Sequence, residues 1–238
     1  YLEASFTKKF DVQKFNATAK RLANNLKMEV NIHYEATKRK RAAILVTKEP
    51  HCLQAMLEAR HKNQLKGEIA VIVGTENTLT KMAKKARIPF VLISENDQTK
   101  AEDKIITIMK KYNVDLIVLA RYMRVLSPNF VWRYPNRIIN IHPSILPAFP
   151  GAYAYVQAYE RGAKIVGCTS HYVTEDLDQG PIIFQDAFAI DEKETLESLK
   201  RKGQKLEAKT LLEAVKMHLE GRLEVYWGKV HVKPKRSK

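Results

Sequence analysis

The sequence predicts an α/β protein built on a mostly parallel sheet with helices on both faces. Continuous apolar runs recur along the chain at residues 42–46, 69–73, 90–93 and 114–119. Between them lie segments with apolar residues at helical spacing, at residues 50–60, 79–86 and 99–112. Strands that are buried on both faces read as continuous apolar runs, so their alternation with amphipathic helices indicates a covered parallel sheet.

The elements beyond these strands follow a different order. A short helix is expected after Ser127-Pro128, and a strand at Ile138-Ile139. Residues 164–173 and 182–189 predict two neighbouring strands, joined by the loop at 174–180. A long helix is expected from about residue 194 to residue 220, followed by a hairpin at residues 222–232 around Gly228.

Residues 1–36 read as a separate, smaller unit with the order strand, helix, strand. Alternation through residues 2–6 and the run 30–34 predict the strands, and Asp11 is the expected N-cap of a helix with an apolar face at Val12, Phe15, Ala19, Leu22 and Leu26. This unit is too small to bury its own core. Its sheet edge and apolar helix face argue for a partner chain, and we expect a homo-oligomer. Residues 37–41 are the expected linker to a main domain at 42–238.

The composition is that of an ordinary globular protein, with 45% hydrophobic and 28% charged residues among 238. No window approaches the roughly 20 apolar residues that span a bilayer, and no signal pattern opens the chain. We therefore expect no membrane partner and a cytoplasmic location. Cys52 and Cys168 stand far apart in apolar surroundings and form no CxxC pair, which favours reduced, buried thiols over a disulfide or a thiolate zinc site.

The formal charge of +15 would suit a polyanionic partner such as nucleic acid. However, the basic residues are scattered over predicted helix faces, apart from the runs at 38–41 and 233–238. Neither run carries the interleaved aromatic residues of a single-strand-binding surface. A solvated surface with some attraction for a small anionic substrate is favoured, and a nucleic-acid partner is not expected.

The segment from residue 137 to residue 185 gathers the polar residues that suit catalysis. Asn140 and His142 follow the apolar run Ile138-Ile139, and Asp178 lies in the loop after a second predicted strand. Ligands of open α/β sheets bind beyond the carboxyl ends of the strands, so we expect these three to meet at one edge. An amide can stabilise an oxyanion, an imidazole can move a proton, and a carboxylate can orient an imidazole or a water. The trio predicts attack on a small carbonyl group.

Other readings of these residues compete with this one. Two histidines, His142 and His171, could bind zinc with an aspartate, but they lack a local ligand spacing. A serine nucleophile at Ser144 or Ser170 would be expected on a GxSxG turn, which is absent. Cys168 lies inside a predicted strand and is expected to be buried and inert. An isolated Asn-x-His is a weak signal, since a histidine that ends a strand is more often a satisfied structural residue.

Several spaced motifs in this segment resemble the 10-formyltetrahydrofolate-dependent formyltransferase family. They are the octapeptide NIHPSILP at 140–147, the residues 167–171, the nonapeptide EDLDQGPII at 175–183 and, for the folate pocket, ARYMRVLS at 120–127. The resemblance implies the Rossmann-like formyltransferase fold, with Asn140, His142 and Asp178 as the catalytic triad and His171 in support. It also implies a cis peptide bond between residues 146 and 147.

The same resemblance implies 10-formyltetrahydrofolate as the substrate and no required cofactor or metal. The pterin head of the folate is expected to lie against two segments, namely Met123, Arg124, Val125 and Leu126, and the loop residues Thr174, Glu175, Asp176 and Leu177. Members of the family with a regulatory unit carry an N-terminal ACT-type domain. Residues 1–36 resemble its second half, so this chain is expected to start inside a longer product.

The turn after the first strand distinguishes branches of the family. Members that act on glycinamide ribonucleotide carry Gly-Ser-Asn there, with backbone amides that hold a phosphate. Residues 47–53 read TKEPHCL, without glycine, and Pro50 has no amide donor. Together with residues 39–41, 120–123 and 134–142, this turn favours the hydrolase branch, which releases formate in one-carbon metabolism and purine synthesis. Pro143 departs from the hydrolase pattern and agrees with the transferases.

Two alternatives therefore stay open from the sequence. One is a transferase that passes the formyl group to an amine acceptor, of the glycinamide ribonucleotide or methionyl-tRNA type. The other is a catalytically silent regulator that binds a folate in the same pocket.

Overall fold

The computed structural model describes residues 11–27, 39–148 and 154–234. The chain divides into a unit of residues Tyr1–Lys38 and a unit of residues Arg39–Lys238. In the smaller unit, helix α1 runs over Val12–Asn25, and the Asp11 carboxylate caps it by accepting the Lys14 amide hydrogen at 3.0 Å. The predicted helix and its cap are thus confirmed. The two strands predicted beside it lie outside the described residues.

The apolar face of α1 is exposed, with Leu22 at 57% and Leu26 at 58% of their full accessibility. The homo-oligomer expected from this face stays a prediction.

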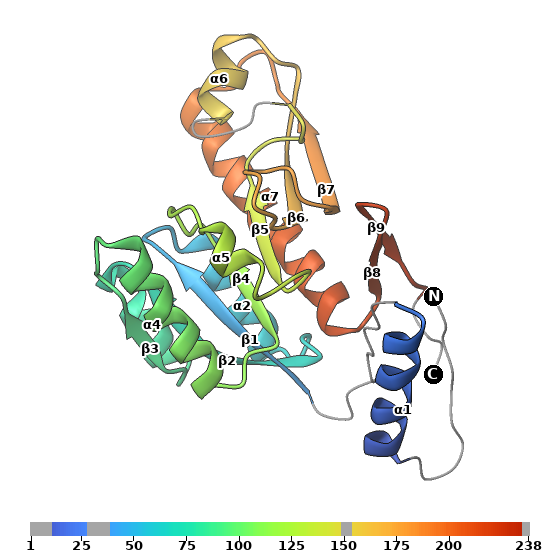
Figure 1. The fold of residues 1–238 in the computed structure, drawn as a ribbon. Coiled ribbons are helices and arrows are strands. Elements are labelled where there is room, and N and C mark those ends of the chain that lie inside the picture. The colour runs from blue at the N-terminus through green and yellow to red at the C-terminus, as the bar shows by residue number, and fades with distance from the viewer. Residues whose placement is uncertain (1–10, 28–38, 149–153, 235–238) are drawn as a thin grey trace. The chain divides into compact units, whose positions relative to one another are not determined.

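Seven strands form one sheet in the larger unit, in the order β3-β2-β1-β4-β5-β6-β7 (Figure 1). The first five strands in this order are parallel, and β6 and β7 are antiparallel to their neighbours. This confirms the predicted mostly parallel α/β sheet. The strands are β1 Lys40–Val46, β2 Gly67–Gly74, β3 Phe90–Leu92, β4 Leu116–Leu119, β5 Ile138–His142, β6 Ile165–Tyr172 and β7 Ile182–Ala189.

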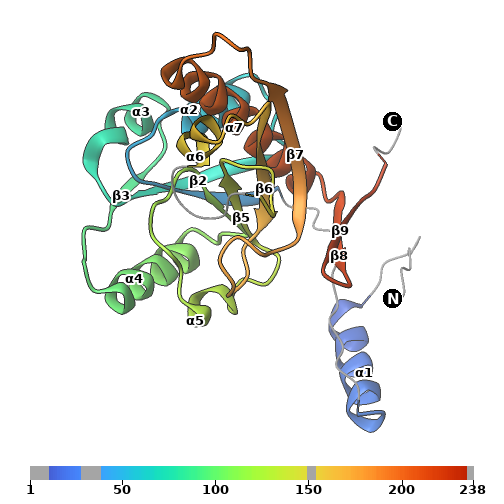
Figure 2. The same ribbon diagram turned by 90° about the horizontal axis from the view of Figure 1, so that it is seen from above.

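Helices cover both faces of this sheet. Figure 2 shows α4 and α5 on one face and α2, α3 and α7 on the other. The predicted helices are confirmed to within a few residues, whereas α6 was not predicted, because its seven residues are too few for a helical pattern to stand out. The helices are α2 His51–His61, α3 Thr80–Lys85, α4 Gln98–Lys111, α5 Pro128–Val131, α6 Ala154–Glu160 and α7 Leu196–Leu219, with a 3-10 turn η1 at Asn77–Leu79.

Strand β1 shows why the strands read as unbroken apolar runs. Ala42, Ile44 and Val46 belong to the core under α2 and α7, and Ala43 and Leu45 belong to the core under α4 and α5. Each side chain is therefore buried, whichever face it points to. The strand begins at Lys40, so two residues of the expected linker belong to it.

The C-terminal hairpin is confirmed. Strands β8, Leu223–Tyr226, and β9, Lys229–Val232, are antiparallel and joined by Trp227 and Gly228. These two residues have φ angles of 54° and 69°. A two-residue turn with positive φ at both positions matches the twist of a hairpin, and glycine adopts this conformation without strain. No helix in the part of the chain that the structure describes is long and apolar enough to cross a membrane.

His218, near the end of α7, is predicted to make the fold sensitive to acid. Its Nδ1 lies 2.8 Å from the Tyr172 hydroxyl. Burial, with the positive charges of Lys40 and Arg137, lowers the pKa of His218 to about 3. Below the usual imidazole pKa of about 6.5 the unfolded chain binds a proton that the folded chain does not. Stability is therefore expected to fall as the pH drops from about 6.5 towards about 3, and the loss is expected to stop below that.

The variant His218→Gln removes this titration. Urea unfolding at about pH 7 and about pH 5 should show a loss of unfolding free energy that is smaller by about 2 kcal/mol in the variant than in the parent protein. An equal loss in both proteins would assign the acid sensitivity to other groups.

Candidate active site

Asn140 and His142 lie on strand β5, and not beyond it as the sequence suggested. The strand continues to His142 because β6 pairs along it, with Asn140 opposite His171 and His142 opposite Thr169. Alternate residues of a strand point to the same face. Asn140 and His142 therefore share one face, while Ile139 and Ile141 lie in the core on the other.

Asp178 reaches these residues from the loop between β6 and β7. Its backbone is left-handed, with φ at 57°, a conformation that Asp tolerates better than most residues. The loop then passes very close to β6 at Gly180, where a Cβ atom would lie 1.7 Å from the Tyr172 carbonyl oxygen. Only glycine fits this approach. The sequence Asp-Gln-Gly thus brings the loop back over the strand with the carboxylate facing the two histidines.

The structure brings the four predicted catalytic residues together. His142 Nδ1 lies 3.1 Å from Asp178 Oδ2, and His171 Nε2 lies 3.7 Å from Asp178 Oδ1. Asn140 Nδ2 lies 3.3 Å from His171 Nε2. The side chains of His142, His171 and Asp178 are between 2% and 7% exposed. An amide, two imidazoles and a carboxylate therefore form one contiguous, largely dry cluster.

Asp178 is held as a carboxylate in this cluster. Burial alone would raise its pKa, but the hydrogen bond from His142 and the proximity of both imidazoles lower the pKa well below the ordinary range. A carboxylate accepts hydrogen bonds and does not donate them, so His142 Nδ1 is the donor. In the neutral ring this leaves Nε2 as the nitrogen that takes up a proton.

His171 orients Asn140. The His171 Nδ1 atom lies 2.9 Å from the Tyr172 carbonyl oxygen, which can only accept, so Nδ1 carries a hydrogen. Its Nε2 lies 3.3 Å from the Asn140 amide nitrogen and 3.7 Å from Asp178 Oδ1, so Nε2 accepts from the Asn140 amide in the neutral ring and donates to Asp178 in the charged ring. The second amide hydrogen keeps a fixed direction. An amide held in this way can donate its second hydrogen to an oxyanion.

Thr169 fixes the turn that follows His142. Its hydroxyl is fully buried, donates to the Ser144 carbonyl oxygen at 2.8 Å and accepts from the Leu146 amide at 3.0 Å. The Ser144 hydroxyl donates to the Ala148 carbonyl oxygen. Ser144 is thus a structural residue. The peptide bond between residues 146 and 147 is cis, as the family resemblance implied.

Cys168 is also structural. Burial raises the pKa of its thiol to about 12, which keeps it protonated and inert as a nucleophile.

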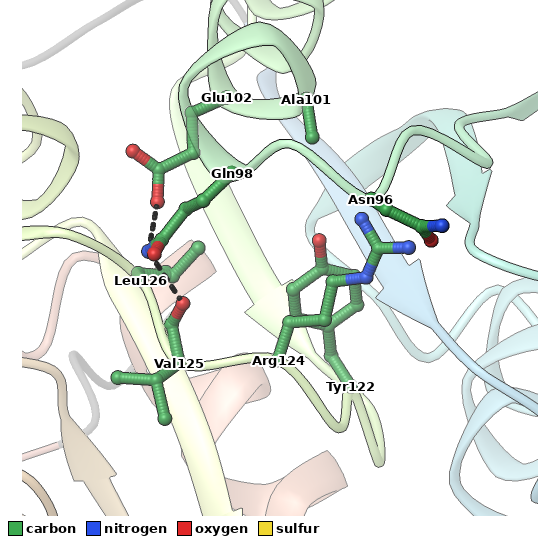
Figure 3. A pocket seen from close by; sticks show the side chains of 8 residues that line it. All are labelled: Asn96, Gln98, Ala101, Glu102, Tyr122, Arg124, Val125 and Leu126. Atoms are coloured by element: carbon green, nitrogen blue, oxygen red, sulfur yellow. Dashed lines mark hydrogen bonds between the residues drawn. The ribbon is translucent and has the colours of Figure 1, made fainter.

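A cavity of about 330 Å³ lies where the chain leaves β3 and β4, at the edge of the sheet that also carries the cluster of Asn140, His142, His171 and Asp178. Figure 3 shows the side chains that line it, from the loop before α4, from the start of α4 and from the segment after β4. Arg124, Val125 and Leu126 of the predicted folate pocket line it, whereas Met123 and residues 174–177 do not. A fourth lining residue, Tyr122, belongs to the folate-pocket segment 120–127, whereas the sequence missed Asn96, Gln98, Ala101 and Glu102. Their place in the chain could have identified them, because residues 96–102 follow β3 at the carboxyl edge of the sheet, where ligands bind.

A second buried polar cluster surrounds Glu207 of α7, which is 1% exposed. Its carboxylate lies 3.2 Å from His51 Nε2, 3.6 Å from Arg121 Nε and 3.0 Å from the Tyr155 hydroxyl. Arg121 follows β4, two residues after Leu119, which pairs with Asn140 in the sheet. The Glu207 cluster therefore lies at the same edge of the sheet as Asn140.

His51, Cys52 and Glu207 place a nitrogen, a sulfur and an oxygen within 4.8 Å of one another, a donor set that could hold a metal ion. Arg121 already supplies a positive charge to the same carboxylate oxygen. Burial and the charge of Glu207 raise the pKa of the Cys52 thiol well above its ordinary value. A metal must displace that proton, so we assign no metal to this cluster.

Comparison with known proteins identifies the family of this fold and site. A sequence profile of the family described as formyl transferase matches residues 40–215. The formyltetrahydrofolate deformylase of Bacillus subtilis (strain 168) is 46% identical over 199 residues, which are 83% of this chain and 66% of that protein. The enzyme of the same name from Haemophilus influenzae is 45% identical, over 89% of this chain and 77% of that protein.

Solved structures agree. A formyltetrahydrofolate deformylase from Pseudomonas syringae superposes with a TM-score of 0.84 at 33% identity, covering 96% of this chain and 77% of that one. Glycinamide ribonucleotide transformylase 1 from Symbiobacterium toebii follows with a TM-score of 0.79 at 33% identity, covering 86% and 99%. We conclude that the chain belongs to the formyl transferase family and, within it, to the group of the formyltetrahydrofolate deformylases.

Proposed function

We propose that this protein hydrolyses 10-formyltetrahydrofolate to tetrahydrofolate and formate. The observation that carries the proposal is the buried cluster in which Asp178 orients His142, and His171 orients Asn140, in a chain similar to deformylases along most of its length. The cluster offers a proton acceptor and an oxyanion donor side by side. Water, the smallest acceptor for a formyl group, needs no further binding site.

In the proposed mechanism, Asn140 donates a hydrogen bond to the formyl oxygen as it becomes an oxyanion. A water attacks the formyl carbon, and His142 Nε2 takes its proton while Asp178 stabilises the charged imidazole. When the tetrahedral intermediate collapses, the bond from carbon to N10 breaks and His142 returns the proton to N10. The formic acid that forms loses its proton to solvent, formate and tetrahydrofolate leave, and the cluster regains its starting protonation.

The folate would bind along the cavity beside this cluster. Strand β4 pairs with β5, so the segment that follows it emerges next to Asn140. The cavity has apolar walls at Val125 and Leu126 and polar groups at Asn96, Gln98 and Tyr122. Flat heterocycles usually bind in such surroundings. Residues 174–177, including the exposed Leu177, would close the other side of the pterin head.

Transfer to an amine acceptor is the alternative that the transformylase structures raise. The turn between β1 and α2 argues against a nucleotide acceptor. Helix α2 begins at His51 directly after Pro50, and no glycine lies between β1 and this start. Without glycine the backbone has less freedom to wrap around a phosphate, and Pro50 removes one amide donor from the turn.

One assay separates these functions. The protein is incubated with 10-formyltetrahydrofolate alone, and formate and tetrahydrofolate are measured. Equal formation of both without an acceptor is the expected result. Turnover that depends on added glycinamide ribonucleotide or methionyl-tRNA would identify a transferase, and binding of the folate without turnover would identify a regulator.

A further inference from the structure

The wall of the cavity formed by residues 122–127 has no helix or strand of its own. It connects the end of β4 at Leu119 with the start of α5 at Pro128. Such a segment keeps one conformation only where its backbone groups have fixed partners. Side chains from two other segments, the turn after β1 and helix α4, provide such partners here, and the segment's own Arg124 side chain adds a contact to a third.

Three of these contacts hold residues 123–125. Arg124 donates to the Glu95 carbonyl oxygen at 2.7 Å, Thr47 accepts the Met123 amide hydrogen at 3.1 Å, and Gln98 donates to the Val125 carbonyl oxygen at 3.0 Å. The fourth set of contacts comes from one residue, Glu102, and it is the most buried.

Glu102 is 7% exposed, and its carboxylate accepts three hydrogen bonds. Two come from Ser127, through its amide at 2.7 Å and its hydroxyl. The third comes from the Gln98 amide at 3.1 Å. Figure 3 shows the chain of contacts from Glu102 through Gln98 to the Val125 carbonyl group. One carboxylate thus holds the segment at its end directly and at Val125 through a single intermediate.

The Ser127 hydroxyl extends this arrangement to α5. While it donates to Glu102, it also accepts the Phe130 amide hydrogen at 3.2 Å as the N-cap of the helix. Among the residues that the structure describes, no lysine or arginine forms a salt bridge with Glu102. Its buried charge is therefore stabilised by hydrogen bonds from the segment itself, and losing them is costly because charged groups are poorly tolerated in a dry site.

We propose that Glu102 is a positioning residue for folate binding, which fixes the main chain of residues 124–127 as one wall of the substrate pocket. This inference rests on the proposed function. The wall is in place before the ligand arrives, so binding does not have to order it. Its role is in affinity and not in the chemical step.

The test is the kinetic profile of Glu102→Gln, which keeps the shape of the side chain but replaces one acceptor oxygen with a donor. The KM for 10-formyltetrahydrofolate should rise roughly tenfold, since hydrogen bonds to a charged group are among the stronger ones, while kcat changes far less. Gln98→Ala removes the link to Val125 and one of the three hydrogen bonds to Glu102, and its KM should rise roughly threefold. Asp103→Asn, a change at the exposed neighbouring position of α4, is the matched control and should keep the parent KM.

Each outcome decides the inference. An unchanged KM in a Glu102→Gln protein that still unfolds cooperatively would overturn it. A fall in kcat with an unchanged KM would overturn it too, because a smaller fraction of folded enzyme lowers kcat without changing KM. If Glu102→Gln does not fold, Gln98→Ala decides in the same way.

Failure of the proposed function is a separate result. If the parent protein releases no formate, the inference is tested through the dissociation constant for tetrahydrofolate in the same variants. An unchanged constant in Glu102→Gln would then reject it.

Discussion

Replacing Asp178 with asparagine is expected to lower kcat for 10-formyltetrahydrofolate hydrolysis about 100- to 10,000-fold, the range in which positioned proton transfer contributes. Asparagine keeps the size of the side chain and tolerates the left-handed backbone at this position, so the loop should keep its shape. It cannot stabilise the charged His142 imidazole. It can also present its amide nitrogen to His142 Nδ1, which would favour the wrong tautomer for taking a proton at Nε2.

The measurement is steady-state formate release, with Asp191→Asn as a control at an exposed aspartate outside the cluster. A kcat within about threefold of the parent in Asp178→Asn would remove the carboxylate from the mechanism.

The lowered pKa of Asp178 adds a pH criterion to the same experiment. This carboxyl group stays ionised throughout the pH range above its ordinary pKa of about 3.9. Loss of parent activity between about pH 7 and about pH 5 must then come from another group, and the midpoint of that loss is not expected to be the titration of Asp178.

The second large effect is expected for Asn140→Ala. Removing one preorganised oxyanion donor typically costs about 2.7–4 kcal/mol of barrier, so kcat should fall roughly 100- to 1000-fold. Because the ground-state carbonyl oxygen needs this hydrogen bond less than the oxyanion does, KM should change little. The variant also leaves His171 Nε2 without the Asn140 amide, but His171 keeps its hydrogen bond to the Tyr172 carbonyl oxygen.

Single-turnover measurements with the bound substrate isolate this step from folate release. Asn129→Ala, on the exposed side of α5, serves as the control for a lost asparagine. Near-parent turnover in Asn140→Ala would mean that the oxyanion is stabilised by other groups, and the proposed division of roles within the cluster would be wrong.

Much of the fold could be predicted from the sequence because its signals are local. Continuous apolar runs marked the parallel strands, and helical spacing marked α2, α3 and α4 to within a few residues. Asp11 as a cap and Gly228 in a hairpin turn follow from the conformations that those residues favour. Helix α6 was missed since a short helix leaves too weak a pattern.

The candidate site was predictable as a set of residues but not as an arrangement. Residue types and family motifs selected Asn140, His142, His171 and Asp178. They could not show that Asn140 and His142 are still within a strand, because that depends on hydrogen bonds from β6, a partner later in the chain. Nor could they assign the roles of the two histidines, which depend on what each ring nitrogen contacts.

The sequence by itself therefore determined the α/β class, the order of the elements and the chemical groups available for attack on a formyl carbon. Periodicity and residue chemistry are properties of neighbouring residues, and they can be read along the chain. The tertiary structure alone decided that Asp178 contacts both imidazoles and that Glu102 holds the pocket wall at Ser127. These are contacts between segments that only the pairing of strands and the packing of α4 bring together, and their energies depend on burial, which no single segment specifies.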